Sequence, residues 1–245
     1  MNIKLGFAVS SLKPDEEELV TKLERVLEFE SDAVELSLTK PEKFNHPFTE
    51  KSFKLLKRFK YRSIHAPARN STGPIIYPSE EADSLLDVID KIIGKIDPQT
   101  ILFHPDTIND FGYINERYGS LVSFENMDNL KTFGRTIEDM AKVFERSPQA
   151  KWVFDVNHLY TNDKNMNSAK EFYETFKDRL THYHVSGYGT WHECFSISHE
   201  DIILKGVFDM SKPMIHEGNA VEKGLMNDEY EYIRNVCCSK NNAGV

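Results

Sequence analysis

The sequence predicts a (β/α)8 TIM barrel that forms a single domain, and three observations lead to this fold class. Short β-branched and aromatic runs alternate with helical segments along the chain, which is the pattern of parallel strands joined by helices. The length of 245 residues is typical of one such barrel. Six of the runs stop at a histidine or an acidic residue before a polar turn, as in SIHAP at 63–67 and ILFHPD at 101–106. A (β/α)8 barrel carries its chemistry at this end of its strands.

Eight strands are expected, each a short run that is rich in branched or aromatic side chains. They cover residues 3–9, 33–38, 61–65, 101–104, 121–125, 151–155, 181–185 and 213–217. Their regular alternation with helices predicts right-handed crossovers and one parallel sheet.

Helices are expected in the intervals between these strands. The first opens at Pro14, Asp15 and Glu16, because proline and acidic residues favour a helix N-terminus. Others are expected near 49–59, 79–95, 136–146, 169–177 and 221–235, with a short helix between the fourth and fifth strands. The barrel domain is expected to span residues 1–238, and 239–245 are expected to form a frayed tail.

Composition excludes several classes of protein. Lys and Arg number 30 against 39 Asp and Glu, so the net charge of −9 argues against broad binding to nucleic acid, although a local basic face stays open. No apolar stretch approaches the roughly 18 residues that span a bilayer, and MNIKLGFAV reads as a strand rather than a signal peptide. The cysteines Cys194, Cys237 and Cys238 have no zinc-ribbon or redox spacing. We expect a cytoplasmic enzyme without a membrane partner, and the oligomeric state stays open.

The residues at the strand ends predict a metal centre. Glu125, Asp155 and Glu217 would converge at the C-terminal end of the barrel, together with His184. Three carboxylates without a cation would repel one another and bind protons more tightly, so they require a metal or a shared proton. One imidazole with three carboxylates is a suitable shell for a divalent ion such as Mn, Zn or Co.

Four further histidines extend this centre. His65 and His104 end strands beside the one that carries Glu125, so this carboxylate could bridge two ions. His158 follows the sixth strand at the start of an expected loop, and His192 follows the seventh. We therefore expect a divalent metal, Zn or Mn, with two ions, or three if His158 and His192 hold another.

Supporting roles are expected for three acidic residues near the strand ends. Glu35, near the end of the second strand, could orient a ligand histidine or only form hydrogen bonds within the barrel, and the sequence leaves both open. Asp106 and Asp128 are further candidates for orienting a ligand.

Substrate contacts are expected from loops at the same end of the barrel. Lys40, Arg69 and Trp191 lie in such loops. A cation there could bind a phosphate or carboxylate group of a substrate, and the alternative is a solvated loop charge.

The ordered set of strand-end residues resembles the xylose isomerase-like TIM barrels, and within them the endonuclease IV branch, also called AP endonuclease family 2. In that branch a zinc cluster is bound by HAP on strand three, HP on strand four, Glu on strand five, Asp-x-x-His on strand six, His on strand seven and Glu on strand eight. The resemblance covers strands two to eight and implies as ligands His65, His104, Glu125, Asp155, His158, His184 and Glu217. No single motif is specific, but the ordered set is.

The sequence also departs from that branch. The third-metal motif Asp-Arg-His would fall on Thr190, Trp191 and His192, so only the histidine is retained. The tyrosine that follows HAP in the repair enzymes is Ala68 here. These departures and the acidic composition count against recognition of abasic sites and favour a two-metal site with a weak or absent third ion.

These residues suggest two main enzymatic functions. Two ions bridged by Glu125 would suit hydrolysis of a phosphoester in a small or sugar-containing substrate, with His158 at the leaving group or at a third ion. In the alternative reaction, an isomerisation or epimerisation, Glu125 and Glu217 would be the catalytic acid and base. The isomerases and epimerases of the same superfamily resemble the chain through the set Glu125, Asp155, His184 and Glu217, which would hold one metal beside a sugar or sugar phosphate. Cleavage of abasic DNA comes third, and a non-catalytic binding barrel is the remaining class.

Overall fold

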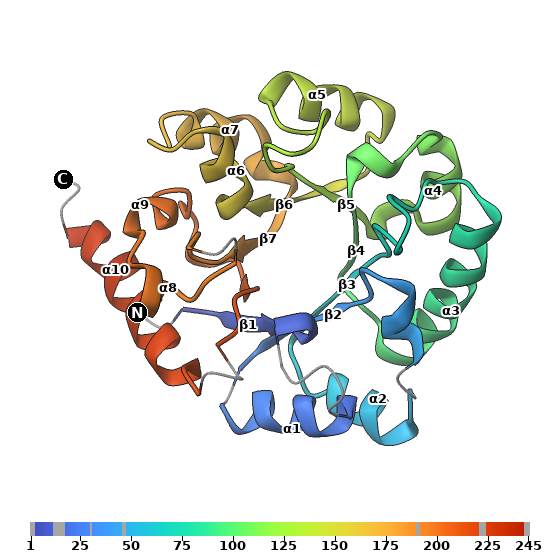
Figure 1. The fold of residues 1–245 in the computed structure, drawn as a ribbon, viewed down its shortest axis with the longest axis horizontal. Coiled ribbons are helices and arrows are strands. Elements are labelled where there is room, and N and C mark those ends of the chain that lie inside the picture. Colours follow the sequence, from blue (N-terminus) through green and yellow to red (C-terminus); the bar gives the residue numbers. More distant parts are fainter. Residues whose placement is uncertain are drawn as a thin grey trace.

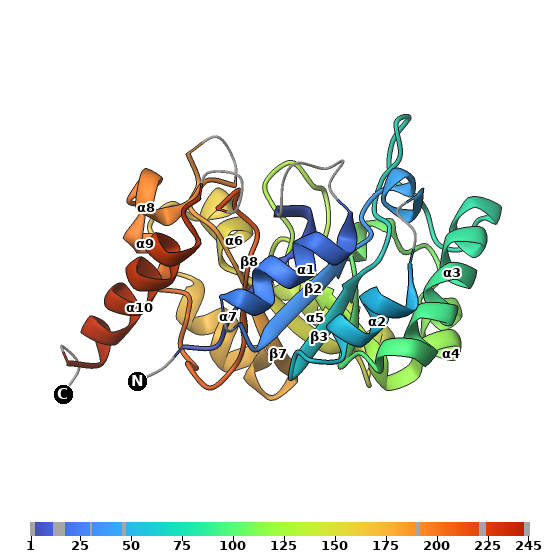
Figure 2. The same cartoon turned by 90° about the horizontal axis from the view of Figure 1, so that it is seen from below.

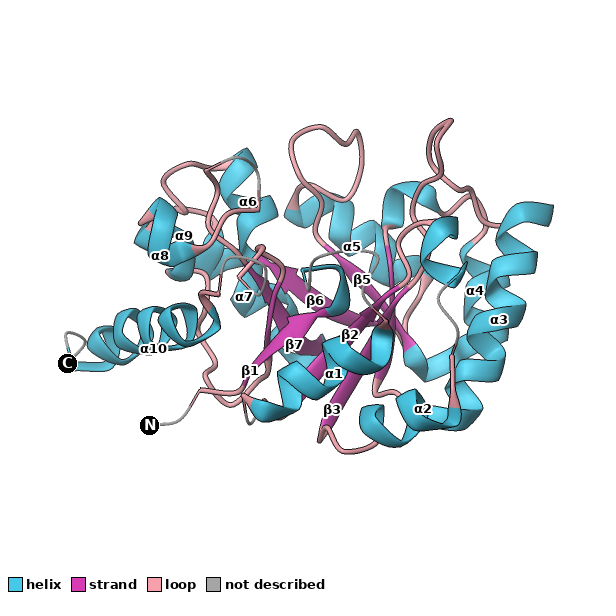
Figure 3. Ribbon diagram, turned by 60° about the horizontal axis from the view of Figure 1, so that its bottom comes forward, coloured by secondary structure: helices cyan, strands magenta, loops and turns pink. Residues whose placement is uncertain are grey.

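The computed structural model describes residues 3–11, 18–29, 31–45, 48–189, 192–220 and 224–242. Eight parallel strands form a closed barrel in chain order, and the last strand pairs with the first (Figure 1). Helices surround this barrel on the outside, so that the strands lie in the interior (Figure 3). The structure therefore confirms the predicted (β/α)8 TIM barrel.

The strands coincide with the predicted runs to within a few residues. They are β1 Leu5–Ala8, β2 Ala33–Ser37, β3 Tyr61–His65, β4 Thr100–Phe103, β5 Val122–Glu125, β6 Lys151–Asp155, β7 Leu180–Val185 and β8 Met214–His216. Nearly all their residues are buried, because one face of the sheet lines the barrel interior and the other is covered by helices. His104 and Glu217 each come directly after a strand.

The helices fill the intervals between strands. They are α1 Leu19–Glu28, α2 Glu50–Leu56, α3 Glu80–Ile96, α4 Phe111–Tyr118, α5 Ile137–Arg146, α6 Val156–Asn162, α7 Ala169–Phe176, α8 Phe195–Ser198, α9 Asp201–Leu204 and α10 Met226–Asn242. The helix between the fourth and fifth strands is short, as expected. Among the described residues, no helix has the length and apolar character that crossing a membrane requires.

Local sequence signals explain where α3 begins and how it packs. The Ser79 side chain accepts a hydrogen bond from the Ala82 N–H and so satisfies one of the unpaired amides of the first turn. Residues three or four apart, among them Leu86 and Ile89, form a fully buried stripe. Each such side chain contributes about 1.5–3 kcal/mol when it leaves water.

Helix boundaries differ from the sequence-based expectation at two places. Helix α6 begins directly after β6, where we expected a loop, because Asp155 caps it. Helix α10 begins at Met226 and runs to Asn242, into the segment for which we expected a tail. The predicted start of the first helix at residues 14–16 and that of the last at 221–223 lie outside the described residues.

Glu229 anchors α10 to the barrel. Its buried carboxylate accepts hydrogen bonds from the backbone N–H groups of Phe195 and Ser196 at 2.9 and 2.6 Å. It also lies 2.9 Å from Nε2 of His216 on β8. One side chain therefore joins α8, α10 and β8.

Two loops project from the C-terminal end of the barrel. The β3–α3 loop comprises residues 66–79 and the β5–α5 loop residues 126–136. Both extend to the same side of the molecule, above the strands (Figure 2). Because the strand ends meet beneath them, these loops form the surroundings of the predicted site.

Candidate metal centre

Glu125, at the end of β5, lies between two groups of ligand atoms. Its Oε1 atom is 2.7 Å from Nε2 of His104 and 3.5 Å from Nε2 of His65. Its Oε2 atom is 3.3 Å from Nδ1 of His184. The two oxygens thus face different histidines, which is the position that a bridging carboxylate requires.

The first group consists of His65, His104 and Glu125. The Nε2 atoms of the two histidines are 3.2 Å apart. Nδ1 of His65 donates a hydrogen bond to the backbone carbonyl of Ala66 at 3.0 Å, so the lone pair of this ring lies on Nε2. Ligands at about 2.0–2.1 Å from a tetrahedral zinc ion lie about 3.3 Å from one another, and the observed separations of 2.7–3.5 Å are of this size.

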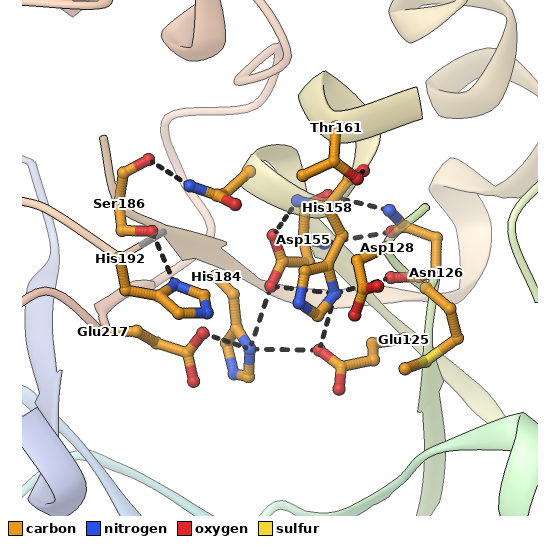
Figure 4. A network of polar contacts seen from close by, with 12 residues as sticks. Glu125, Asn126, Asp128, Asp155, His158, Thr161, His184, Ser186, His192 and Glu217 are labelled. Atoms are coloured by element: carbon orange, nitrogen blue, oxygen red, sulfur yellow. Dashed lines mark hydrogen bonds and ion pairs between the residues drawn. The ribbon is translucent and has the colours of Figure 1, made fainter. Parts of the chain in front are cut away.

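The second group surrounds Nδ1 of His184 on β7. This atom lies 3.3 Å from Glu125 Oε2, 3.5 Å from Glu217 Oε2 and 3.8 Å from Asp155 Oδ2. Figure 4 shows these carboxylates converging on the histidine from three sides. The four residues come from or directly follow β5, β6, β7 and β8, so the barrel itself brings them together.

Several of these atoms have no hydrogen-bond partner among the described residues although they are buried. They include both carboxylate oxygens of Glu125, Oδ2 of Asp155 and Nδ1 of His184. Buried polar atoms are rarely left in this state, since each loses its contacts with water without replacement. A divalent ion in each group would satisfy them, and the residues therefore fit a centre of two ions.

The pKa values of the buried carboxylates also indicate that the cluster lacks positive charge. Burial is the main cause that raises the pKa of Asp155. Burial, with Asp155 and Glu125, also raises the pKa of Glu217 to about 7 against the opposing charge of His184. Burial alone would raise the pKa of Glu125 too, but the surrounding histidines, His104 first, hold it well below its usual value. The cluster thus competes for protons when no metal neutralises it.

Glu35 lies below His184 in the barrel interior. Its Oε2 atom is 3.1 Å from His184 Nε2 and accepts a hydrogen bond from Ser63 Oγ at 2.9 Å. His182 Nε2 lies 3.5 Å from the same oxygen, and the Tyr61 hydroxyl is 2.7 Å from His182 Nδ1. With Nε2 of His184 protonated towards Glu35, its Nδ1 is the nitrogen available to a metal. Of the two roles open for Glu35, this geometry favours the orientation of a ligand.

His158 lies in the first turn of α6. Its backbone N–H donates to Asp155 Oδ1 at 2.7 Å, and its Nδ1 donates to the carbonyl of Asn126 at 3.0 Å. Burial alone would lower the pKa of His158, but Asp155 and Glu125 outweigh it and raise the pKa to about 9. Its ring faces that of His192 at a centroid distance of 6.0 Å.

His158 and His192 are the residues that the sequence leads us to expect at a third ion. Nδ1 of His192 lies 2.9 Å from the Ser186 hydroxyl, and burial lowers the pKa of His192 to about 3. Within the described part of the chain, neither His158 nor His192 belongs to a group of three residues that could hold an ion. Thr190 and Trp191, on which the family's third-metal motif would fall, lie outside the described residues.

A cavity of about 260 Å³ lies above the two groups. It is lined by ligand candidates and by residues of both projecting loops, namely Thr39, His65, Ala68, Arg69, His104, Glu125, Asp128, Lys131, His158, His192 and Glu217. Of the three expected substrate contacts, Arg69 lines this cavity, whereas Lys40 is not among its lining residues. Trp191, the third expected contact, lies outside the described residues.

The hydrogen bonds that the other two expected supporting residues form are with loop residues. Asp106 forms an ion pair with Lys131 at 2.9 Å, and among the described residues no hydrogen bond joins it to a ligand candidate. Asp128 lines the cavity and accepts a hydrogen bond from the Leu130 N–H at 2.7 Å. Both acids therefore hold residues of the β5–α5 loop, Lys131 through Asp106 and Leu130 through Asp128.

Sequence reasoning missed two residues of the site. Asn126 exchanges two hydrogen bonds with the backbone of Asp155, at 2.8 and 3.0 Å, and so fixes β5 against β6. Its position directly after Glu125 is the signal that could have identified it. Lys131 carries positive charge at the cavity, and no spacing rule would have identified a lysine inside a loop.

No protein-family model and no curated protein matches the sequence. Solved structures do match the fold. The probable 3-DHS dehydratase AsbF of Bacillus anthracis has a TM-score of 0.68 at 12% identity, over 95% of this chain and 99% of that one. Endonuclease IV of Thermus thermophilus has a TM-score of 0.65 at 12% identity, over 95% and 99%.

D-psicose 3-epimerase of Clostridium cellulolyticum, solved with D-tagatose, also has a TM-score of 0.65 at 12% identity, over 95% of this chain and 97% of that one. A xylose isomerase domain-containing protein of Salmonella typhimurium is a further neighbour. The chain therefore shares the TIM-barrel fold of these proteins. These neighbours include enzymes of several reaction classes, so the fold alone does not select a reaction.

Proposed function

We propose that the protein is a divalent-metal-dependent hydrolase of a phosphoester in a small or sugar-containing substrate. The observation that carries this proposal is the position of Glu125, whose Oε1 atom faces His65 and His104 and whose Oε2 atom faces His184. A carboxylate shared by two ligand groups is the arrangement of a two-metal site. A one-metal site would leave the two histidines on the Oε1 side without a role.

Zn²⁺ and Mn²⁺ are the ions that imidazole and carboxylate ligands favour here. His65 and His104 would hold one ion, and Asp155, His184 and Glu217 would hold the other. When bound, two such ions would polarise a phosphoryl oxygen and lower the pKa of a water molecule towards neutrality.

The protein's own residues supply charge and proton transfer. Arg69 and Lys131 line the cavity and place positive charge where an anionic substrate enters. Nδ1 of His158 is held by the Asn126 carbonyl, so its other ring nitrogen, Nε2, is the one that can deliver a proton to a leaving oxygen. Without a metal, burial alone would lower the pKa of His158, but Asp155 and Glu125 raise it to about 9.

The test is the metal content of the protein purified without chelator, measured by elemental analysis. We expect two equivalents per chain in the wild type and a loss of about one equivalent in His65→Ala. The control is His199→Ala, since this exposed histidine contacts Tyr232 away from the centre. Hydrolysis of p-nitrophenyl phosphate by the metal-loaded protein tests the reaction itself. One equivalent that is unchanged in His65→Ala contradicts the two-metal proposal.

The second candidate is a sugar or sugar-phosphate isomerase or epimerase with a single metal. Glu125, Asp155, His184 and Glu217 form a complete ligand set for it. Glu125 and Glu217 would be the acid and base that move a proton at a sugar carbon in this candidate. Exchange of a ketose C–H hydrogen with deuterated solvent, observed by NMR at one metal equivalent, would support this candidate.

Cleavage of abasic DNA is the third candidate. The net charge of −9 and the presence of Ala68 after the strand-three motif count against it. Cleavage of an abasic duplex, with a rate that falls steeply between about 50 and 200 mM salt, would support it instead.

A further inference from the structure

A second groove, which the proposed reaction leaves without a role, adjoins the metal cavity. This groove has a volume of about 560 Å³ and lies between residues 68–74 of the β3–α3 loop and residues 130–132 of the β5–α5 loop, with Asp106 beside them. Ala68, Arg69 and Lys131 line both spaces. The two spaces are therefore neighbours that share part of their wall.

The wall formed by the β3–α3 loop is held by its own hydrogen bonds. Oδ1 of Asn70 accepts the N–H groups of Thr72 and Gly73 at 2.8 and 3.0 Å. Nδ2 of Asn70 donates to both carboxylate oxygens of Glu81 on α3, at 2.9 and 2.8 Å. An isolated antiparallel bridge between Arg69 and Pro74 closes the loop. This wall is shaped before a ligand arrives, which lowers the entropy cost of binding.

The opposite wall carries an orienting ion pair and an exposed apolar side chain. The Lys131 ammonium is 2.9 Å from Asp106 Oδ2, so it is fixed at the junction of the two spaces. Leu130 is 75% exposed, more than any other large hydrophobic residue among those described. An apolar side chain left in water at a groove can contact the carbon skeleton of a ligand.

Arg69 is the charge in the groove that no partner neutralises. It is exposed, and within the described part of the chain it forms no ion pair. Its guanidinium offers five donors in a planar fork that matches a phosphate or carboxylate group. The two proposed metal ions already provide for the phosphoryl group that reacts, so Arg69 is left for a second anion.

We propose that this groove is a subsite for a second anionic group, and that the substrate is a small molecule with two such groups. One group lies at the metal centre, and the other lies in the groove against Arg69, with Lys131 between them and Leu130 beside the connecting carbon atoms. The proposal rests on the proposed function for the group at the metal centre.

The experiment measures binding rather than turnover. Alkane α,ω-bisphosphonates with spacers of increasing length are compared with the matching alkyl monophosphonates by calorimetry on zinc-loaded protein. Neither probe is hydrolysed. We expect at least one spacer length to bind about tenfold more tightly than its monophosphonate, because a second charge-assisted contact forms. In Arg69→Ala this ratio should fall to nearly one.

The matched control is Arg58→Ala, which removes an exposed arginine next to β3 at the opposite end of the barrel. This variant should keep the wild-type ratio. Equal affinities of both probes at every spacer length, or a ratio that Arg69→Ala leaves unchanged, overturn the subsite. Failure of the wild type to hydrolyse p-nitrophenyl phosphate contradicts the proposed function alone, since the bisphosphonate ratio does not depend on turnover.

Discussion

The carboxylate of Glu125 separates two groups of ligands, one on each oxygen. Replacing it by glutamine keeps the shape of the side chain but removes the charge that both groups share. We expect Glu125→Gln to bind fewer than two metal equivalents. We also expect its kcat/KM to fall by more than the roughly 10- to 100-fold loss that is typical when a residue that orients a metal ligand is replaced. Elemental analysis and phosphoester hydrolysis measure the two effects, and a variant that retains both ions and full activity would exclude the bridging role.

Glu35 acts on the centre through His184 rather than by direct contact. Glu35→Gln would weaken the hold on Nε2 of His184 and is expected to lower metal affinity by about 10- to 100-fold. Competition with a chromophoric chelator measures this affinity, and circular dichroism checks that the barrel is folded.

The chain offers a matched control for this substitution. Glu229 is also a buried glutamate that contacts a histidine, but on the helical side of the barrel. Glu229→Gln should leave the metal affinity unchanged. If both variants lower the affinity equally, a general loss of stability rather than orientation of His184 explains the effect.

The strands are the elements that allow the candidate site to be predicted from the sequence. His65, Glu125, Asp155 and His184 each end a strand or lie one residue from its end, and the carboxyl ends of parallel barrel strands meet on one rim. Their proximity therefore follows from the strand pattern alone, although they lie far apart along the chain.

The loops could not be predicted in the same way. Asp106 and Lys131 lie 25 residues apart and form an ion pair only because two loops are brought together by the barrel. From the sequence, Asp106 is expected to orient a metal ligand, because Asp106 closely follows His104. Helix α6 could not be predicted for a different reason. The strand-end position of Asp155 indicates a metal ligand, and this pattern does not indicate that the same side chain also caps a helix.

Glu229 gives a pH-dependent prediction at the junction of α8, α10 and β8. Burial would raise its pKa, but His216 and the Ser196 N–H hold the pKa below the ordinary value of 4.5. A carboxyl with a lowered pKa stabilises the fold above its unfolded pKa, and this contribution is lost as the pH falls through the folded pKa. We expect Glu229→Gln to lose about 1.5–3 kcal/mol of unfolding free energy near pH 7.

The contribution of Glu229 is measured as a function of pH. Urea unfolding of both proteins at several pH values should give a difference that is constant above pH 4.5 and shrinks below it. A difference that stays constant in acid would mean that packing rather than charge makes the contribution.

At the scale of the whole molecule, the fold was predictable because a barrel depends on a pattern rather than on particular residues. The neighbours described above keep this fold at 12% identity. Function was less predictable, since proteins described as an epimerase, an endonuclease and a dehydratase share one architecture, and barrels of this fold vary their chemistry through their loops. Here Arg69, Leu130 and Lys131 lie in such loops, and their arrangement around the groove required the structure.

Removal of the metal should destabilise the entire barrel, because the ligands come from β3 through β8 and their charges are otherwise uncompensated. Burial raises the pKa values of Asp155 and Glu217, so the metal-free protein has buried carboxylates that repel one another or bind protons.

Metal at about 100 times its Kd adds about 2.7 kcal/mol to the unfolding free energy, which corresponds to about 5–10 °C in Tm for a chain of this size. We expect this difference between zinc-loaded protein and protein dialysed against chelator, measured by calorimetry at neutral pH. Glu125→Gln should show a much smaller increase on addition of zinc, because both ligand groups lose the carboxylate charge that they share. A wild-type Tm that does not respond to metal would mean that the cluster is held by shared protons rather than by ions.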